Sequence, residues 1–153
     1  MKTLIGTFLA LNLLCASSGN VRAQTSNELL LETLGATSAG FIYNTYLAIG
    51  SIGDAYENGN TSAEDVKALM EEQVGLLRNL EESYSNLLSS GEITNQSDKD
   101  YIIELRETFS TLRMQADALI TYAMEGGVPN ADRFQEHRNK AWSLISDLMG
   151  LDE

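Results

Sequence analysis

The sequence predicts an all-α protein, an up-down-up-down antiparallel four-helix bundle that follows a cleavable signal peptide. The chain has 153 residues and only one proline. Turn-forming residues divide it into four long segments. Within these segments apolar residues recur every three or four positions, which is the spacing of one helix face. We expect a signal peptide at 1–23 and a single domain at 24–153, with helices over approximately 26–57, 62–89, 98–125 and 131–149.

The first 23 residues have the pattern of a secretory signal. Lys2 gives a positive start, and the apolar run over 3–14 is shorter than the roughly 20 residues that a membrane span needs. Val21 and Ala23 are the small residues that a signal peptidase reads, so we predict cleavage between Ala23 and Gln24. This indicates a secreted or periplasmic protein.

A lipoprotein signal is the alternative interpretation of the same segment. Cys15 would then be the acylated residue, and the residues after it would form a tether to the membrane. The residue before such a cysteine should be small, and here it is Leu14. We therefore favour simple cleavage after Ala23.

Cleavage would make the chain more acidic. It removes Lys2 and Arg22, which leaves eight basic residues against 22 acidic ones and changes the formal charge from -12 to -14. Such a charge repels phosphate backbones and anionic membrane surfaces, so we expect no nucleic-acid partner. It also removes Cys15, the single cysteine, so disulfide bonds and thiolate chemistry would not be available.

Each break between segments is followed by a residue that can cap a helix. Thr61 or Ser62 precedes the second segment, Ser97 the third and Asn130 the fourth, and carboxylates follow within a few positions of each. Side-chain oxygens at such positions accept hydrogen bonds from the first free amides of a helix. Asn60 and Asn95 also begin Asn-x-Ser sequons, which matter only in a eukaryotic host.

The apolar periodicity predicts which residues of the last three segments form the core. In the second segment these are Val66, Met70, Val74, Leu77, Tyr84, Leu87 and Leu88. In the third they are Ile102, Leu105, Phe109, Leu112, Ala116, Leu119 and Ala123. In the fourth they are Phe134, His137, Ala141, Leu144, Leu148 and Leu151.

The first segment is unusual because residues 33–53, 21 in all, include no charged side chain. Its polar residues and four glycines argue against a membrane span, and we expect no transmembrane helix in the mature chain. Burial as the central helix of the bundle is the simplest interpretation. The other is a face that binds a protein partner or a second copy, for which the candidates are Phe41, Tyr43, Tyr46 and Leu47.

The sequence offers little catalytic or metal-binding chemistry. Its one histidine, His137, cannot supply the two Glu-x-x-His motifs of a di-iron bundle, and no Cys-x-x-Cys-His haem motif or nucleophile elbow occurs. Glu71 and Glu82 lie four residues from Lys67 and Arg78, which is ordinary surface pairing. We therefore expect no catalytic residue, no cofactor and no metal site.

These observations favour a non-enzymatic, exported interaction or self-association module. We expect it to bind a protein partner or to form a homo-oligomer. The alternative is an extracytoplasmic carrier of a small ligand, haem or metal. Its pocket would lie between the helices near Phe109, His137 and Trp142.

Overall fold

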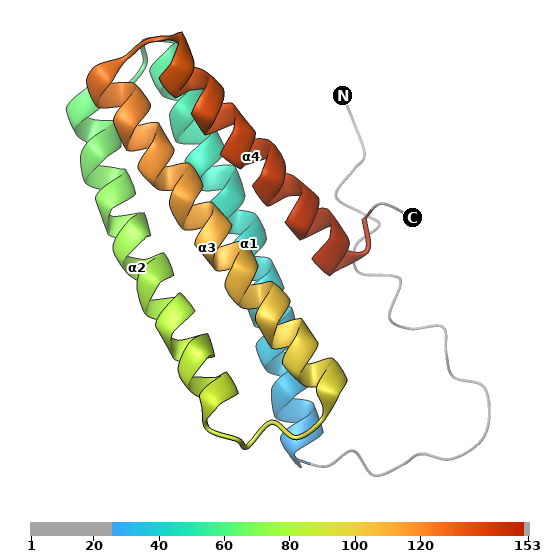
Figure 1. Cartoon of the computed structure of the whole chain (residues 1–153). Coiled ribbons are helices and arrows are strands. Elements are labelled where there is room, and N and C mark those ends of the chain that lie inside the picture. The colour runs from blue at the N-terminus through green and yellow to red at the C-terminus, as the bar shows by residue number, and fades with distance from the viewer. Residues whose placement is uncertain (1–25, 152–153) are drawn as a thin grey trace.

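The computed structural model describes residues 26–151, with side chains from residue 29 onward. This part of the chain is all-helical and forms four helices, in agreement with the predicted fold class (Figure 1). Their bounds are α1 Ser26–Glu57, α2 Ala63–Ser89, α3 Gln96–Glu125 and α4 Val128–Met149. The signal peptide, its cleavage after Ala23 and the Cys15 alternative lie outside the described residues.

Successive helices run in opposite directions, as Figure 1 shows. Two connections, 58–62 between α1 and α2 and 126–127 between α3 and α4, meet at one end of the bundle, which we call the closed end. The start of α1 and the 90–95 connection between α2 and α3 lie at the other end, which we call the open end.

The central helix is α3, not α1 as we expected. It packs extensively against both α2 and α4, whereas α1 packs more lightly on the other three and least on α2. All seven predicted core residues of α3 are buried, and so are four further residues on its sides, Thr108, Thr111, Gln115 and Ala118. The absence of charge in α1 therefore does not reflect burial on all sides.

The buried face of α2 confirms the sequence prediction for Val66, Met70, Val74, Leu77 and Tyr84, while Leu87 and Leu88 are partly buried. Of the predicted α4 core, Phe134 and Ala141 are buried and Leu148 is partly buried, while Ile145 and Ser146 are buried in addition. Leu151, which we expected in the core, follows the end of the helix and is exposed.

Two of the expected helix caps are wrong. Ser62 does cap α2, and its hydroxyl accepts a hydrogen bond from the Asp65 amide at 3.1 Å. Ser97 instead lies inside α3, whose cap is Asn95, with a carboxamide oxygen 2.9 Å from the Ser97 amide. Asn130 lies in the first turn of α4, where its side chain donates to the Gly126 carbonyl at 2.8 Å. An Asn side chain can bond backbone groups that precede or follow it. The errors at Ser97 and Asn130 therefore concern only the first residues of α3 and α4.

Polar groups are buried on α3 and α4. The Thr111 hydroxyl, the Ser146 hydroxyl and both carboxamide atoms of Gln115 have no hydrogen-bond partner among the described residues. A buried polar group without a partner lowers stability by about 1–3 kcal/mol. The core therefore draws its stability from the apolar contacts around these groups.

Close contacts with glycine join α1 to α4 at the closed end. A Cβ atom added at Gly53 would lie 2.7 Å from Cζ of the buried Phe134 ring. One added at Gly50 would lie 3.0 Å from the Arg138 guanidinium, which crosses that position to reach Asp54 at 2.7 Å. These glycines let α4 approach α1, which explains two of the four glycines in the uncharged stretch.

None of the helices described, from Ser26 to Met149, combines the length and apolar character that crossing a membrane requires.

Candidate functional site at the open end

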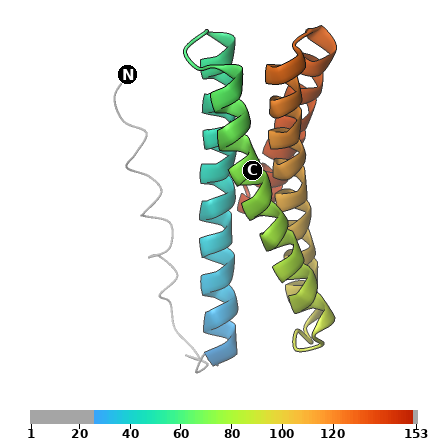
Figure 2. The same cartoon turned by 90° about the vertical axis from the view of Figure 1, so that its left-hand side faces the viewer.

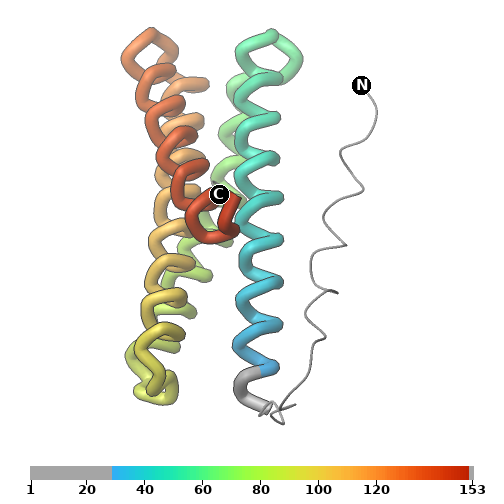
Figure 3. Tube along the Cα trace, turned by 90° about the vertical axis from the view of Figure 1, so that its right-hand side faces the viewer, coloured from blue at the N-terminus to red at the C-terminus, as the bar shows by residue number. Residues whose placement is uncertain are grey.

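The helices part at the open end. Figure 2 shows α2 beside α1 at the closed end and diverging from it toward the 90–95 connection. Figure 3 shows that α4 stops part-way along α1. With 22 residues against 30 in α3, α4 is about 12 Å shorter at the usual rise per residue. The first turns of α1 therefore have fewer neighbours than the rest of that helix.

A groove lies between α1 and α3 at this end. Two adjoining hollows of about 400 Å³ and 390 Å³ form it, and they share Leu31, Asn95 and Asp98. We call the two together the open-end groove. Its twelve lining residues are Leu30, Leu31, Glu32, Leu34, Gly35, Glu92, Ile93, Thr94, Asn95, Asp98, Tyr101 and Leu105.

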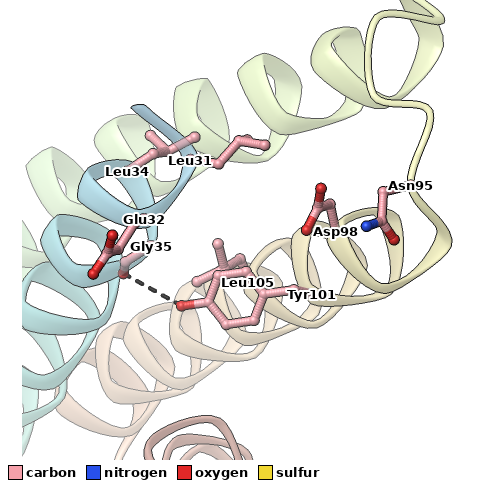
Figure 4. Close-up of a pocket in the computed structure, with 8 residues that line it drawn as sticks. All are labelled: Leu31, Glu32, Leu34, Gly35, Asn95, Asp98, Tyr101 and Leu105. Carbon is pink, nitrogen blue, oxygen red and sulfur yellow. Dashed lines mark hydrogen bonds between the residues drawn. The ribbon is translucent and has the colours of Figure 1, made fainter. Parts of the chain in front are cut away.

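One wall of the groove is fixed by a contact between Tyr101 of α3 and Gly35 of α1. The Tyr101 hydroxyl donates to the Gly35 carbonyl at 3.3 Å (Figure 4). A Cβ atom added at Gly35 would lie 3.1 Å from the Tyr101 ring, so the ring can rest on the helix backbone because residue 35 is glycine. Figure 4 shows Leu31 and Leu34 on α1 across from Asp98 on α3.

Tyr101 stays neutral in this position. Burial raises the pKa of its hydroxyl above the ordinary value, and the nearby Tyr84 and Glu104 act in the same direction. A neutral phenol can donate to the Gly35 carbonyl at any physiological pH. The contact between α1 and α3 at the open end is therefore independent of pH in that range.

Farther along, α1, α2 and α3 meet around a cluster of rings. The Phe109 ring lies 6.2 Å from Phe41 of α1 and 5.3 Å from Tyr84 of α2. The Tyr84 hydroxyl also shares a hydrogen bond with the Ser38 hydroxyl of α1. Phe109 and Tyr84 belong to the hydrophobic core, which extends to the groove through Leu105.

Leucine side chains around the groove are exposed. Leu30 has a relative accessibility of 64%, Leu29 of 55% and Leu34 of 36%. Isolated exposed leucines are common on proteins, but these three lie within two turns of one helix, beside an apolar hollow. Such a grouping is typical of a binding surface.

The charged residues that line the groove are all acidic. Glu32, Glu92 and Asp98 line it, and none of its twelve lining residues is basic. Residues 29–41 and 81–105, which build the open end, carry seven carboxylates and one basic side chain, Lys99. Of these seven carboxylates, Glu81 is paired with Arg113 of α3 at 2.7 Å.

The four residues predicted as an interaction face do not share one surface. Phe41, Tyr43 and Tyr46 are partly buried and pack against the core, and the Tyr46 ring lies 5.5 Å from that of Trp142 on α4. Leu47 alone points outward, with 44% accessibility. The outward face of α1 is composed instead of small and uncharged residues, namely Thr33, Ala36, Thr37, Gly40, Asn44, Leu47, Ala48 and Ser51.

The three residues predicted to line a ligand pocket have different surroundings. Phe109 is buried in the ring cluster, and Trp142 is 40% exposed beside Tyr46. His137 lines an open hollow of about 310 Å³ on the other side of α3, with Met114, Asp117, Ala118, Thr121 and Arg133. The structure does not bring the three together around one cavity.

Over the part of the chain that the structure describes, no three side chains of His, Cys, Asp or Glu are grouped so that they could hold a metal ion.

The sequence contained a signal for the groove that its periodicity did not reveal. Leu29, Leu30 and Leu31 are consecutive, and consecutive helical residues point about 100° apart, so the three cannot all face one core. Ile93 is an apolar residue inside a short polar connection. Each feature indicates apolar surface that the fold does not bury completely.

Comparisons with known proteins give no relative for this chain. No protein family, curated protein sequence or solved structure matches it. The function must therefore be argued from the site itself.

Proposed function

We propose that this chain is an exported, non-enzymatic interaction module that binds a protein partner through the open-end groove. The observation that carries the proposal is a groove with leucines among its lining residues, two of which, Leu30 and Leu34, are exposed. Burying one leucine completely is worth about 1.5–3 kcal/mol, so covering this surface would supply a substantial part of a binding free energy.

Crosslinking inside the native organism tests occupancy of the groove directly. The photoreactive amino acid p-benzoylphenylalanine would replace Leu34 in one variant and Leu30 in another, within the full chain. Matched controls would carry it at Leu69 or Leu76 of α2, which are 45% and 43% exposed and lie outside the groove. We expect an adduct of one defined mass from the groove positions after illumination and none from the controls.

The adduct also identifies the occupant. An adduct with twice the mass of the chain would mean a second copy, and a different mass would mean a separate partner. Equal crosslinking from groove and control positions, or none from either groove position, would contradict the proposal. Mass spectrometry of the same protein gives its N-terminus, which we expect at Gln24 after export; a lipid on Cys15 would support the anchored alternative instead.

Self-association through the outward face of α1 is the second candidate. Two observations favour it. The face has no charge between residues 33 and 53, and a Cβ added at Gly40 would meet nothing within 4 Å, so nothing inside the fold requires glycine there. A helix glycine lowers stability by about 1 kcal/mol relative to alanine.

Light scattering after size-exclusion chromatography separates this candidate from the first. We expect Gly40→Glu to convert a dimer to a monomer if α1 mediates self-association. The control is Gly75→Glu on α2, another helical glycine whose added Cβ would meet nothing within 4 Å. A chain that is monomeric without any substitution would eliminate self-association and leave the groove proposal intact.

A further inference from the structure

We infer that the partner of the open-end groove is a cationic amphipathic helix, an inference that rests on the proposed function of the groove. Such a helix would place an apolar stripe on the leucines of the groove and direct its lysines or arginines to the carboxylates around it. Three properties point to this class of partner: the walls of the groove, the charge of the groove and the net negative charge of the whole chain.

The walls of the groove favour a helical ligand over an extended one. They are formed by α1 and α3, whose backbone groups beyond the first turn are paired within each helix, and by the 92–95 segment between α2 and α3. No sheet edge exists in the described residues to pair with a strand. A helix needs no backbone partner and binds a groove through apolar side chains at positions i, i+3, i+4 and i+7.

The charge of the groove favours a basic ligand. Glu92 is exposed in the connection beside Ile93, and Glu32 lies one turn from the exposed Leu29. With Asp98, these carboxylates line the same groove as Leu31, Leu34 and Leu105. A ligand that carried carboxylates of its own would be repelled at the rim, whereas lysine or arginine at the edge of an apolar stripe would be attracted.

The composition of the chain argues against a second copy as the occupant of the groove. The whole chain carries 22 acidic and 10 basic residues. The net charge is -12, so two copies of the chain repel each other overall, which disfavours a second copy as the occupant.

Titration calorimetry with three synthetic peptides tests the inference on protein purified after expression of all 153 residues. The first is an 18-residue leucine–lysine helix with an apolar stripe on one side. The second has the same composition in an order that destroys the stripe. The third keeps the stripe and replaces every lysine with glutamate. We expect the first peptide to bind at least tenfold more tightly than either of the others, and its affinity to fall with added salt.

Two double variants assign the binding to the groove. Glu32→Gln with Glu92→Gln should weaken binding of the lysine peptide about fivefold, since exposed charge contacts are individually weak. Glu72→Gln with Glu136→Gln makes the same change in net charge at exposed positions outside the groove, and should leave the affinity unchanged. Asp98 is left intact because it lies in the first turn of α3 and supports that helix.

A third double variant, Leu30→Ser with Leu34→Ser, separates the inference from the proposed function. Suppose that Leu30→Ser with Leu34→Ser weakens peptide binding, while the two Glu→Gln double variants bind the lysine peptide equally well. The groove then binds helices without a charge preference, and the inference fails while the proposed function stands. If Leu30→Ser with Leu34→Ser has no effect on the lysine peptide, that peptide does not bind in the groove and the inference fails, while the crosslinking experiment decides the proposed function separately. If the scrambled lysine peptide binds as tightly as the one with an apolar stripe, general charge attraction explains the binding and the inference is overturned.

Discussion

The two ends of this bundle use the same helix, α1, in opposite ways. At the closed end, Gly50 and Gly53 bring α1 against α4, and the Tyr56 hydroxyl donates to the Ala123 carbonyl of α3 at 3.0 Å. α4 ends before it reaches the open end. A hollow with exposed leucines beside it lies there instead of packed helix faces. The closed end holds α1 to the bundle, whereas the open end leaves part of α1 exposed.

The largest difference between the two ends is expected from truncating Phe134, whose ring is fully buried against Gly53. We expect Phe134→Ala to lower the free energy of unfolding by about 3–5 kcal/mol, because it removes a large ring and leaves a cavity. Leu30→Ala at the open end should change it by less than about 0.5 kcal/mol. Urea denaturation of both variants gives the two values. Similar losses from the two would show that the ends do not differ as described.

The two glycines Gly53 and Gly40 provide a finer test within one helix. In Gly53→Ala the new methyl group would press on the Phe134 ring, and we expect a loss of about 1–3 kcal/mol from this overpacking. In Gly40→Ala the methyl group has open space, so helix propensity should raise stability by about 1 kcal/mol. Thermal unfolding measures both. A stabilised Gly53→Ala would mean that α4 does not approach α1 closely.

The smallest expected effect is that of pH on the Asp54–Arg138 pair at the closed end. The hydrogen bond from Arg138 lowers the pKa of Asp54 below its ordinary value. The folded protein therefore binds a proton at Asp54 less tightly than the unfolded chain does. The stabilisation is fully present above the ordinary pKa and is lost as pH falls through the lowered one, below about pH 4.

The size of that effect follows from exposure. The Asp54 side chain is 54% accessible, so the pair should contribute no more than about 1 kcal/mol. Urea denaturation at pH 7 and pH 3, compared between the unsubstituted protein and Asp54→Asn, isolates it. We expect the difference between the two proteins to shrink at pH 3, and a difference that grows instead would show that the pair does not stabilise the folded state.

Much of the fold was predictable because it depends on local patterns. The spacing from Ile102 to Ala123 predicted the buried face of α3, and glycine-rich breaks predicted the number of helices. The position of α1 was not predictable in the same way. Its inward residues include Gly35, Ser38, Thr45 and Gly53, which hydrophobicity does not identify as core, and its lack of charge suggested more burial than it has.

The groove could not be predicted from the sequence, for a different reason. It exists because α2 diverges from α1 and α4 ends early, and both are properties of how helices far apart in the sequence are placed. The run from Leu29 to Leu31 indicated surplus apolar surface, but the sequence could not show that Ile93 and Asp98 lie beside it. A predicted helix length alone does not give the angle between helices.

Chemical-shift mapping tests the central claim, that the open end binds while the closed end holds the fold. Amide resonances of the isotope-labelled protein would be followed during titration with the leucine–lysine helix. We expect shift changes concentrated in residues 30–35 and 92–105 and nearly absent from residues 53–57 and 126–134. Changes spread evenly over the acidic surface, or centred on the closed end, would contradict it.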